Sequence, residues 1–175
     1  LSSLTQKNQF QKFNEFLIWF ENKKNEEQFI VKEIPFSKFD QWYFSENKEN
    51  LGHQSGKFFK IEGIHFKTNF GLNKEWYQPI INQPEIGILG ILTKEFNGTL
   101  YFLMQAKMEP GNINILQLSP TVQATKSNFS RVHKGKITAY LDYFIDRSKS
   151  EVLIDQLQTE QGARFLRKRN RNIVV

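Results

Sequence analysis

Hydrophobic and polar residues alternate along residues 117–125, where every odd-numbered position is a neutral hydrogen-bonding residue. Side chains along a strand point alternately to its two faces, so one face here would be apolar and the other polar. The pattern fits the solvated face of an edge strand, and Pro120 suits an edge. It also fits a surface that binds a ligand with many hydroxyls. We call the polar positions the neutral row: Gln117, Ser119, Thr121, Gln123 and Thr125.

Other segments rich in β-branched and aromatic residues also predict strands. Residues 98–108 and 113–124 are two such runs, separated by the sequence EPGN. Pro followed by Gly is typical of a type II turn, which suits a hairpin with a longer loop better than a two-residue hairpin. The remaining predicted strands are 29–34, 57–68, short strands within 76–93, 151–158 and 172–175.

Three segments have helical spacing or capping signals: 5–23, 135–146 and 160–168. In the first, phenylalanines recur every three or four residues, which predicts an amphipathic helix that packs on the domain edge or binds a partner. Hairpins, a crossover and flanking helices together favour an α+β or α/β fold with a mixed sheet. The length suits one domain. We expect an N-terminal helical segment over 1–30 and a single module over 31–175.

The composition and the missing motifs exclude several kinds of catalytic and metal site. The chain has no cysteine, so disulfides, thiolate nucleophiles and cysteine zinc sites are excluded. Its three histidines lack a ligand-like spacing, and neither a phosphate-binding glycine loop nor a serine nucleophile elbow is found. We therefore expect no metal and no cofactor. No apolar run reaches the roughly 20 residues that span a bilayer, and the N-terminus lacks a secretory signal, so we expect a cytoplasmic protein without membrane contact.

Positive charge is concentrated near the carboxyl end. The net charge is +6, and residues 164–171 hold five basic residues and no acidic one. Arg and Lys bind phosphates, whereas amides and hydroxyls bind sugars. A nucleotide sugar matches both the basic segment and the neutral row, if the two meet in one cleft. Nucleic acid is a less favoured partner, because the sequence has basic charge but no recognisable nucleic-acid-binding motif.

Several ordered segments resemble one enzyme family. They include HQSGKFFKIEGI (53–64), the block EPGN…QLSPTVQAT (109–125) and KRNRN (168–172). These are similar to the NDP-hexose 2,3-dehydratases of deoxysugar biosynthesis. The resemblance implies a Nudix-like fold, with two related modules per chain and no cofactor or metal. It also implies an NDP-4-keto-6-deoxyhexose substrate, with dTDP-4-keto-6-deoxyglucose expected, from which water is removed across carbons 2 and 3.

This chain resembles a single module, the first of the two. We therefore expect it to pair with a second copy as a homodimer or with a second module. Two alternatives to a dehydratase remain open: a non-catalytic Nudix-like module that binds a nucleotide sugar, and a basic nucleic-acid-binding domain. Turnover of the keto sugar separates the first alternative from the enzyme, and salt-sensitive oligonucleotide binding identifies the second.

The dehydratase reading assigns a role to each candidate residue. His133 and Glu160 are the candidates for proton transfer, although a surface histidine and a first-turn helical glutamate explain them equally well. Lys107 or His53 would polarise the ketone. The other predicted binding residues are Gln117, Gln123, Thr125 and Asn128 for the sugar, Arg131, Lys168, Arg169 and Arg171 for the diphosphate with Asn170 beside them, and Trp76 or Tyr77 for the base.

Overall fold

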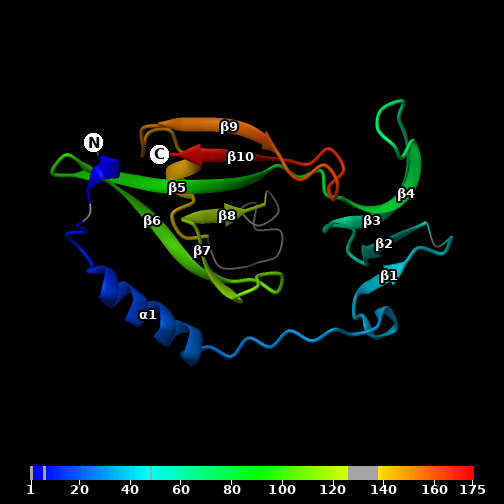
Figure 1. Cartoon of the computed structure of the whole chain (residues 1–175), viewed down its shortest axis with the longest axis horizontal. Coiled ribbons are helices and arrows are strands. Elements are labelled where there is room, and N and C mark those ends of the chain that lie inside the picture. Colours follow the sequence, from blue (N-terminus) through cyan, green and yellow to red (C-terminus); the bar gives the residue numbers. More distant parts are fainter. Residues whose placement is uncertain (1, 6, 48, 126–137) are drawn as a thin grey trace.

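We describe a computed structural model of the whole chain, which defines residues 2–5, 7–47, 49–125 and 138–175. The chain forms a mixed α+β structure with two sheets and few helices, as Figure 1 shows. The predicted α+β class is therefore confirmed. In the described part of the chain, no helix is both long and apolar enough to cross a bilayer.

The first sheet is a four-stranded antiparallel meander in the order β1-β2-β3-β4. Its last two strands form a long hairpin in which eight residue pairs face each other, from Lys60–Asn82 to Lys67–Glu75. Leu51 and Ile80 are its buried hydrophobic residues. The strands are β1 (Trp42–Phe44), β2 (Asn50–His53), β3 (Lys60–Lys67) and β4 (Glu75–Asn82).

The second sheet has six strands, in the order β7-β6-β5-β10-β9 with β8 also paired to β5. Only β5 and β10 are parallel, and the other neighbours are antiparallel. The expected hairpin between 98–108 and 113–124 is confirmed by the pairing of β6 with β7. The strands are β5 (Gly87–Phe96), β6 (Thr99–Met108), β7 (Leu116–Pro120), β8 (Val122–Ala124), β9 (Ile154–Thr159) and β10 (Arg169–Val174).

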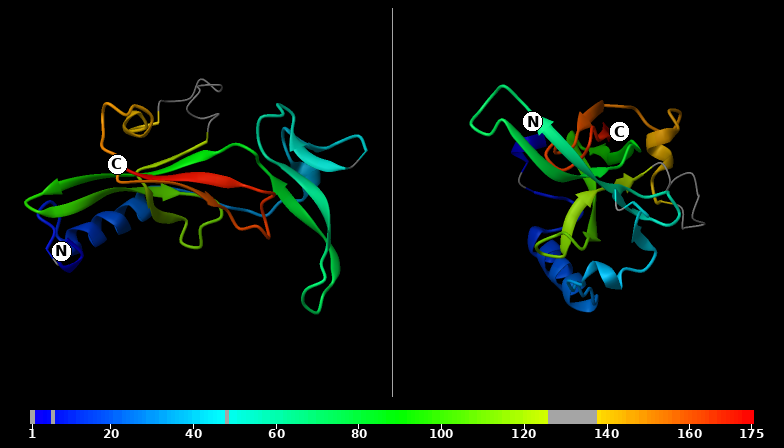
Figure 2. Two further views of the ribbon diagram at one scale, coloured as in Figure 1. Left: turned by 90° about the horizontal axis from the view of Figure 1, so that it is seen from above. Right: turned by 90° about the vertical axis from the view of Figure 1, so that its right-hand side faces the viewer.

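The main core lies between this second sheet and the short helix α3 (Asp142–Ile145). The Phe144 ring is 1% exposed and packs over Gly90, where an added Cβ would collide with it. Figure 2 shows α3 on one side of the six-stranded sheet and α1 (Phe13–Glu26) on the other. The core cluster consists of Ile88, Val122, Ala124, Leu141, Phe144, Ile173 and Val175.

The predicted N-terminal helix is shorter than expected. It begins at Phe13, and none of its residues is buried. Phe10 lies outside the helix and makes edge-on contacts with Phe96 and Tyr101, at ring-centroid distances of 4.7 and 5.0 Å. This aromatic packing fixes the start of the chain against the β5–β6 hairpin instead. A 3-10 turn, Ser2–Leu4, precedes the helix and another, Phe36–Lys38, follows it.

Two predicted elements are wrong, and one is reduced. Residues 29–34 pair with no described strand, so their β-rich composition alone does not make them a strand. Residues 160–168 form a turn rather than a helix, because their backbone pairs with β4: Ile81 N–H donates to the Arg164 carbonyl and Leu166 N–H to the Ile81 carbonyl, both at 2.8 Å. Of 135–146, only α3 is helical in the described residues, and 135–137 lie outside them.

Candidate functional site

The neutral row does not form one continuous face. The chain bends at Thr121, so that β7 pairs with β6 whereas β8 pairs with β5. Thr121 is 7% exposed; its hydroxyl donates to the Leu103 carbonyl and accepts from Leu92 N–H at 2.9 Å. Ser119 is also buried, while Leu118 is half exposed. Thr121 therefore holds strands together. Gln117 pairs with Lys107 on β6, whereas Gln123 pairs with Leu89 on β5.

A row of amides crosses the second sheet on the face opposite α3. The strand register places Gln123, Leu89, Asn172 and Gln156 side by side across β8, β5, β10 and β9. A second row on the same face, two residues along the strands, contains Gly87 on β5, Asn170 on β10 and Gln158 on β9. Paired residues on neighbouring strands project to the same side, so these amides share a surface. We call it the amide face, and its members are Gln123, Gln156, Gln158, Asn170 and Asn172.

Lys107 and Gln123, which were both predicted as site residues, are in contact next to the amide face. Lys107 Nζ donates to Gln123 Oε1 at 2.9 Å and lies 2.9 Å from Glu109 Oε1. Gln123 Nε2 donates to the same carboxylate oxygen at 3.3 Å. The Lys107 side chain is 30% exposed, so its ammonium is both held in place and reachable from solvent.

A second polar group lies farther along the same face. Asn170 Nδ2 donates to Glu160 Oε1, while Asn170 Oδ1 accepts from Gly87 N–H at 3.1 Å. Both ends of the amide are thus occupied, and one carboxylate oxygen of Glu160 is fixed. Lys168, 5% exposed, donates to the Glu85 carbonyl, and burial lowers the pKa of its ammonium despite the carboxylates of Glu160 and Glu85 nearby.

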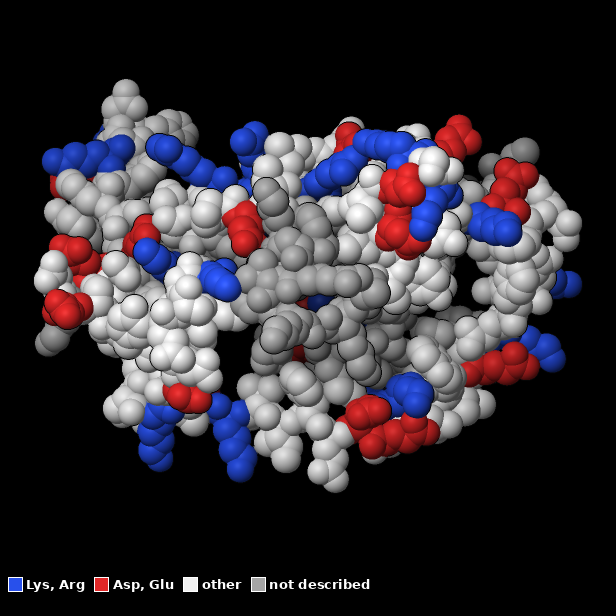
Figure 3. All heavy atoms as spheres, turned by 180° about the vertical axis from the view of Figure 1, so that it is seen from behind, with Lys and Arg blue, Asp and Glu red and all other residues white. Residues whose placement is uncertain are grey.

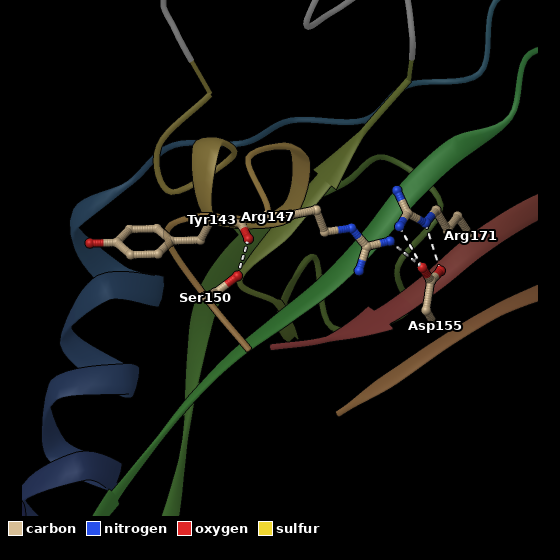
Figure 4. A network of polar contacts seen from close by, with 5 residues as sticks. All are labelled: Tyr143, Arg147, Ser150, Asp155 and Arg171. Atoms are coloured by element: carbon tan, nitrogen blue, oxygen red, sulfur yellow. Dashed lines mark hydrogen bonds and ion pairs between the residues drawn. The ribbon is translucent and has the colours of Figure 1, made fainter. Parts of the chain in front are cut away.

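Arg169 and Arg171 do not join this face. They alternate with Asn170 and Asn172 along β10, so their side chains project to the α3 side of the sheet. Arg171 pairs with Asp155 through its Nε and Nη2, at 2.6 and 2.5 Å, and Arg147 reaches the same carboxylate at 2.9 Å (Figure 4). The basic segment and Gln123 were expected to form one cleft. For Arg169 and Arg171 this expectation is wrong, because their side chains lie on the opposite side of the sheet from Gln123.

The Asp155 pair is a structural clamp. The hydrogen bond from Arg171, with support from Arg147, lowers the pKa of Asp155 to about 2. The carboxylate in turn raises the pKa of the Arg171 guanidinium. The clamp joins β9, β10 and the turn after α3, a turn that is closed by the Ser150 hydroxyl donating to the Tyr143 carbonyl (Figure 4).

The remaining predicted residues are scattered or undefined. His53 is on β2, where its ring contacts Trp42 and Phe58 and its Nδ1 lies 2.7 Å from Ser55 Oγ. Trp76 stacks on Phe66 in the β3–β4 hairpin. Thr125 follows β8 and is half buried. Asn128, Arg131 and His133 lie outside the described residues.

Some residues of this surface were missed at the sequence level: Gln156, Gln158 and Asn172. The alternation in RNRN (169–172) and DQLQT (155–159) could have shown that the amides share one face and the arginines another. Among the described residues, no three His, Asp or Glu side chains are grouped closely enough to hold a metal ion. Figure 3, seen from behind relative to Figure 1, shows basic and acidic side chains interspersed over the visible described surface rather than one basic patch.

These groups can bind a polyhydroxylated ligand and move a proton on it. Amides donate to and accept from sugar hydroxyls, a fixed carboxylate can accept a proton, and an ammonium can stabilise a developing oxyanion. All of them lie on or beside one sheet face.

Comparisons with known proteins agree with that chemistry. The family model described as NDP-hexose 2,3-dehydratase matches residues 13–175. Three relatives are named dTDP-4-dehydro-6-deoxy-alpha-D-glucopyranose 2,3-dehydratase. One from Saccharopolyspora spinosa is 53% identical over 161 residues, covering 92% of this chain and 33% of the relative. One from Amycolatopsis orientalis is 51% identical, covering 90% and 34%.

The third relative, from Streptomyces violaceoruber, is 47% identical, covering 91% of this chain and 36% of its own length. The chain therefore spans about a third of the length of the relatives it matches. The match of the family model over nearly the whole chain, together with these identities, shows that the chain belongs to the NDP-hexose 2,3-dehydratase family.

Proposed function

We propose that this chain is a module of a sugar-nucleotide 2,3-dehydratase that binds an NDP-4-keto-6-deoxyhexose, with dTDP as the nucleotide diphosphate. The observation that carries the proposal is the fixed Glu160 carboxylate at one end of the amide face, with the Lys107 ammonium at the other. Family membership and the printed names of the relatives support the substrate class. The proposal includes a Nudix-like module, a cytoplasmic location and no cofactor.

The reaction needs a base, an oxyanion stabiliser and an acid. The 4-keto group acidifies the hydrogen on carbon 3, so a base removes that proton and an enolate forms. The carbon 2–oxygen bond then breaks, the hydroxyl leaves with a proton as water, and the enol product tautomerises to a diketo sugar. Positioned acid–base groups contribute roughly 10²–10⁴-fold each to such steps.

Glu160 is the proposed base. Asn170 occupies one of its oxygens, which leaves the other to face the substrate. Because Gly87 N–H holds the far end of the same amide, Asn170 is a positioning residue rather than a substrate ligand. This revises the role expected for Asn170 from the sequence.

Lys107 is the proposed oxyanion stabiliser. Its ammonium is held between Glu109 and Gln123, so it needs little reorganisation when charge develops on the ketone oxygen. Gln123 would then bind the neighbouring sugar hydroxyl. Of the described residues predicted to bind the diphosphate, Lys168 alone follows the alternation onto the amide face. Because its ammonium is buried and donates to the Glu85 carbonyl, we assign it the role of fixing the backbone at residue 85 beside this face, and not a diphosphate contact.

A second copy or a second module is the proposed partner that completes the enzyme. The support is that the relatives are about three times as long as the part that this chain matches. His133 is the proposed general acid. The non-catalytic binding module is the second candidate, because the chain matches only about a third of the length of the relatives that are named dehydratases.

The test is to incubate the chain with dTDP-4-keto-6-deoxyglucose in deuterated water and to follow deuterium at carbon 3 and loss of water by mass spectrometry. We expect exchange in the parent chain, none in Glu160→Gln, and parent behaviour in Glu151→Gln, an exposed glutamate before β9. Full exchange in Glu160→Gln would remove Glu160 as the base. Binding without exchange would favour the non-catalytic module.

A further inference from the structure

Strand β9 is an exposed edge of the second sheet. Among the strands that the structure describes, β10 is its single neighbour, and all six of its residues are exposed. In Figure 1 it runs along the outer margin of the sheet. Natural edge strands are usually protected by lysine, proline or a bulge, because open backbone groups recruit other strands. The sequence IDQLQT contains neither lysine nor proline.

The backbone hydrogen bonds define which groups of β9 are open. Glu160 N–H donates to the Lys168 carbonyl, and Val175 N–H to the Ile91 carbonyl, so even-numbered residues of β10 face β9 and odd-numbered ones face β5. In the antiparallel register, the even-numbered residues of β9 therefore point inward. Asp155, Leu157 and Thr159 carry their N–H and C=O groups toward the outer edge.

The side chains of this edge are complementary to themselves. Residues 155–159 read Asp-Gln-Leu-Gln-Thr, with Leu157 at the centre. Antiparallel pairing of two such strands about Leu157 places Leu157 against its own copy, Gln156 against Gln158, and Asp155 against Thr159. The charge of Asp155 is already neutralised by Arg171 and Arg147, so bringing two copies together meets little repulsion.

We propose that β9 pairs antiparallel with β9 of a second copy of this chain, about a twofold axis at Leu157. The six-stranded sheets of the two copies then become one continuous sheet. Because that axis is perpendicular to the joined sheet, the amide faces of both copies lie on the same side, with Gln156 and Gln158 of each at the junction. The inference deepens the proposal that a second copy is the partner, and it does not depend on the dehydration chemistry.

Cysteine cross-linking tests the axis directly, because the chain has no cysteine of its own. In Leu157→Cys the two thiols face each other with Cα atoms about 5.5 Å apart, a distance that disulfides span. The matched control is Leu153→Cys: Leu153 is 51% and Leu157 45% exposed. Its two copies would lie about 27 Å apart at the usual strand rise. Mild oxidation should therefore give a covalent dimer of the first variant and not of the second.

Sedimentation of the untreated chain supplies the second readout. We expect a dimer that Leu157→Pro and Leu157→Lys convert to monomer, while near-ultraviolet circular dichroism stays unchanged. The proline removes an outward N–H, so no bond to β10 is lost. A monomer at all concentrations, equal cross-linking of both cysteine variants, or a dimer that survives both Leu157 substitutions would overturn the proposal. If Leu157→Pro does not fold, Leu157→Lys and the cysteine pair decide. If the chain forms this dimer but does not dehydrate the sugar nucleotide, the result counts against the proposed function and leaves the β9 pairing intact.

Discussion

The Phe144 ring lies directly over the backbone of Gly90, in the space that any Cβ at that position would occupy. This contact joins α3 to the centre of β5 and closes the main core. We expect Gly90→Ala to lower the free energy of unfolding by about 2 kcal/mol, because the ring must move out of a packed site. Chemical denaturation measures the loss. Gly63→Ala is the control, since no atom lies within 4 Å of its added Cβ; an equal loss in both would contradict the packing argument.

Thr121 holds three strands together through one hydroxyl. Its replacement by the isosteric valine leaves Leu92 N–H and the Leu103 carbonyl without their bond to this group in a mostly buried place. We expect Thr121→Val to destabilise the protein by about 2 kcal/mol. Thr99→Val, at the start of β6, should change stability little, and thermal denaturation of the pair is the measurement. A sugar-binding role alone would leave the melting temperature of Thr121→Val unchanged.

The clamp around Asp155 makes stability depend on pH. The pKa of Asp155 is lowered to about 2, so its ionised carboxylate is more stable in the folded chain, where the two arginines contact it, than in the unfolded chain. The carboxylate therefore adds to the free energy of unfolding at pH values above the ordinary pKa of an aspartate, and this stabilisation is lost as the pH falls toward 2. We expect Asp155→Asn to cost about 1 kcal/mol at pH 7, after allowance for solvent screening. The difference from the parent should shrink below pH 4; a constant difference from pH 7 to pH 2.5 would contradict the clamp.

Asn170 should tune the proposed base. Asn170→Asp keeps an oxygen for Gly87 N–H but places a second carboxylate beside Glu160. A nearby negative charge raises the pKa of a carboxyl group. The acid limb of the pH profile for exchange at carbon 3 should therefore move to higher pH by about one unit. Asn73→Asp, an exposed position in the loop between β3 and β4, is the control and should not shift the profile. A parallel fall in rate at every pH would indicate a purely structural role.

Gln123 and Arg169 separate the two faces of the sheet. Gln123→Ala removes a neutral hydrogen bond on the amide face and should weaken nucleotide-sugar binding by about fivefold, as measured by calorimetry. Arg169→Ala changes the opposite face and should leave the affinity within about twofold, the change expected of a distant surface charge in moderate salt. The reverse order of effects would place the substrate on the α3 side.

The hairpin of β6 and β7 could be predicted from sequence, because EPGN separates two strand-like runs that are neighbours along the chain. The alternation of residues 117–125 and 169–172 was equally visible. It determined which side chains share a face wherever the strand is continuous, and for that reason Asn170 separates from Arg171. The family resemblance rested on ordered segments of the same kind, and the match to the family model confirmed it.

Pairing between distant segments was decided by the tertiary structure alone. The chain bends at Thr121 and exchanges β6 for β5, so a pattern with a period of two residues could not show that the neutral row divides there. Residues 160–168 have helical signals, yet the backbone of Ile81 pairs with them and favours a turn. Local sequence sets the preference of each segment, but the partner that satisfies its backbone comes from elsewhere in the chain, and that partner decides which side chains meet.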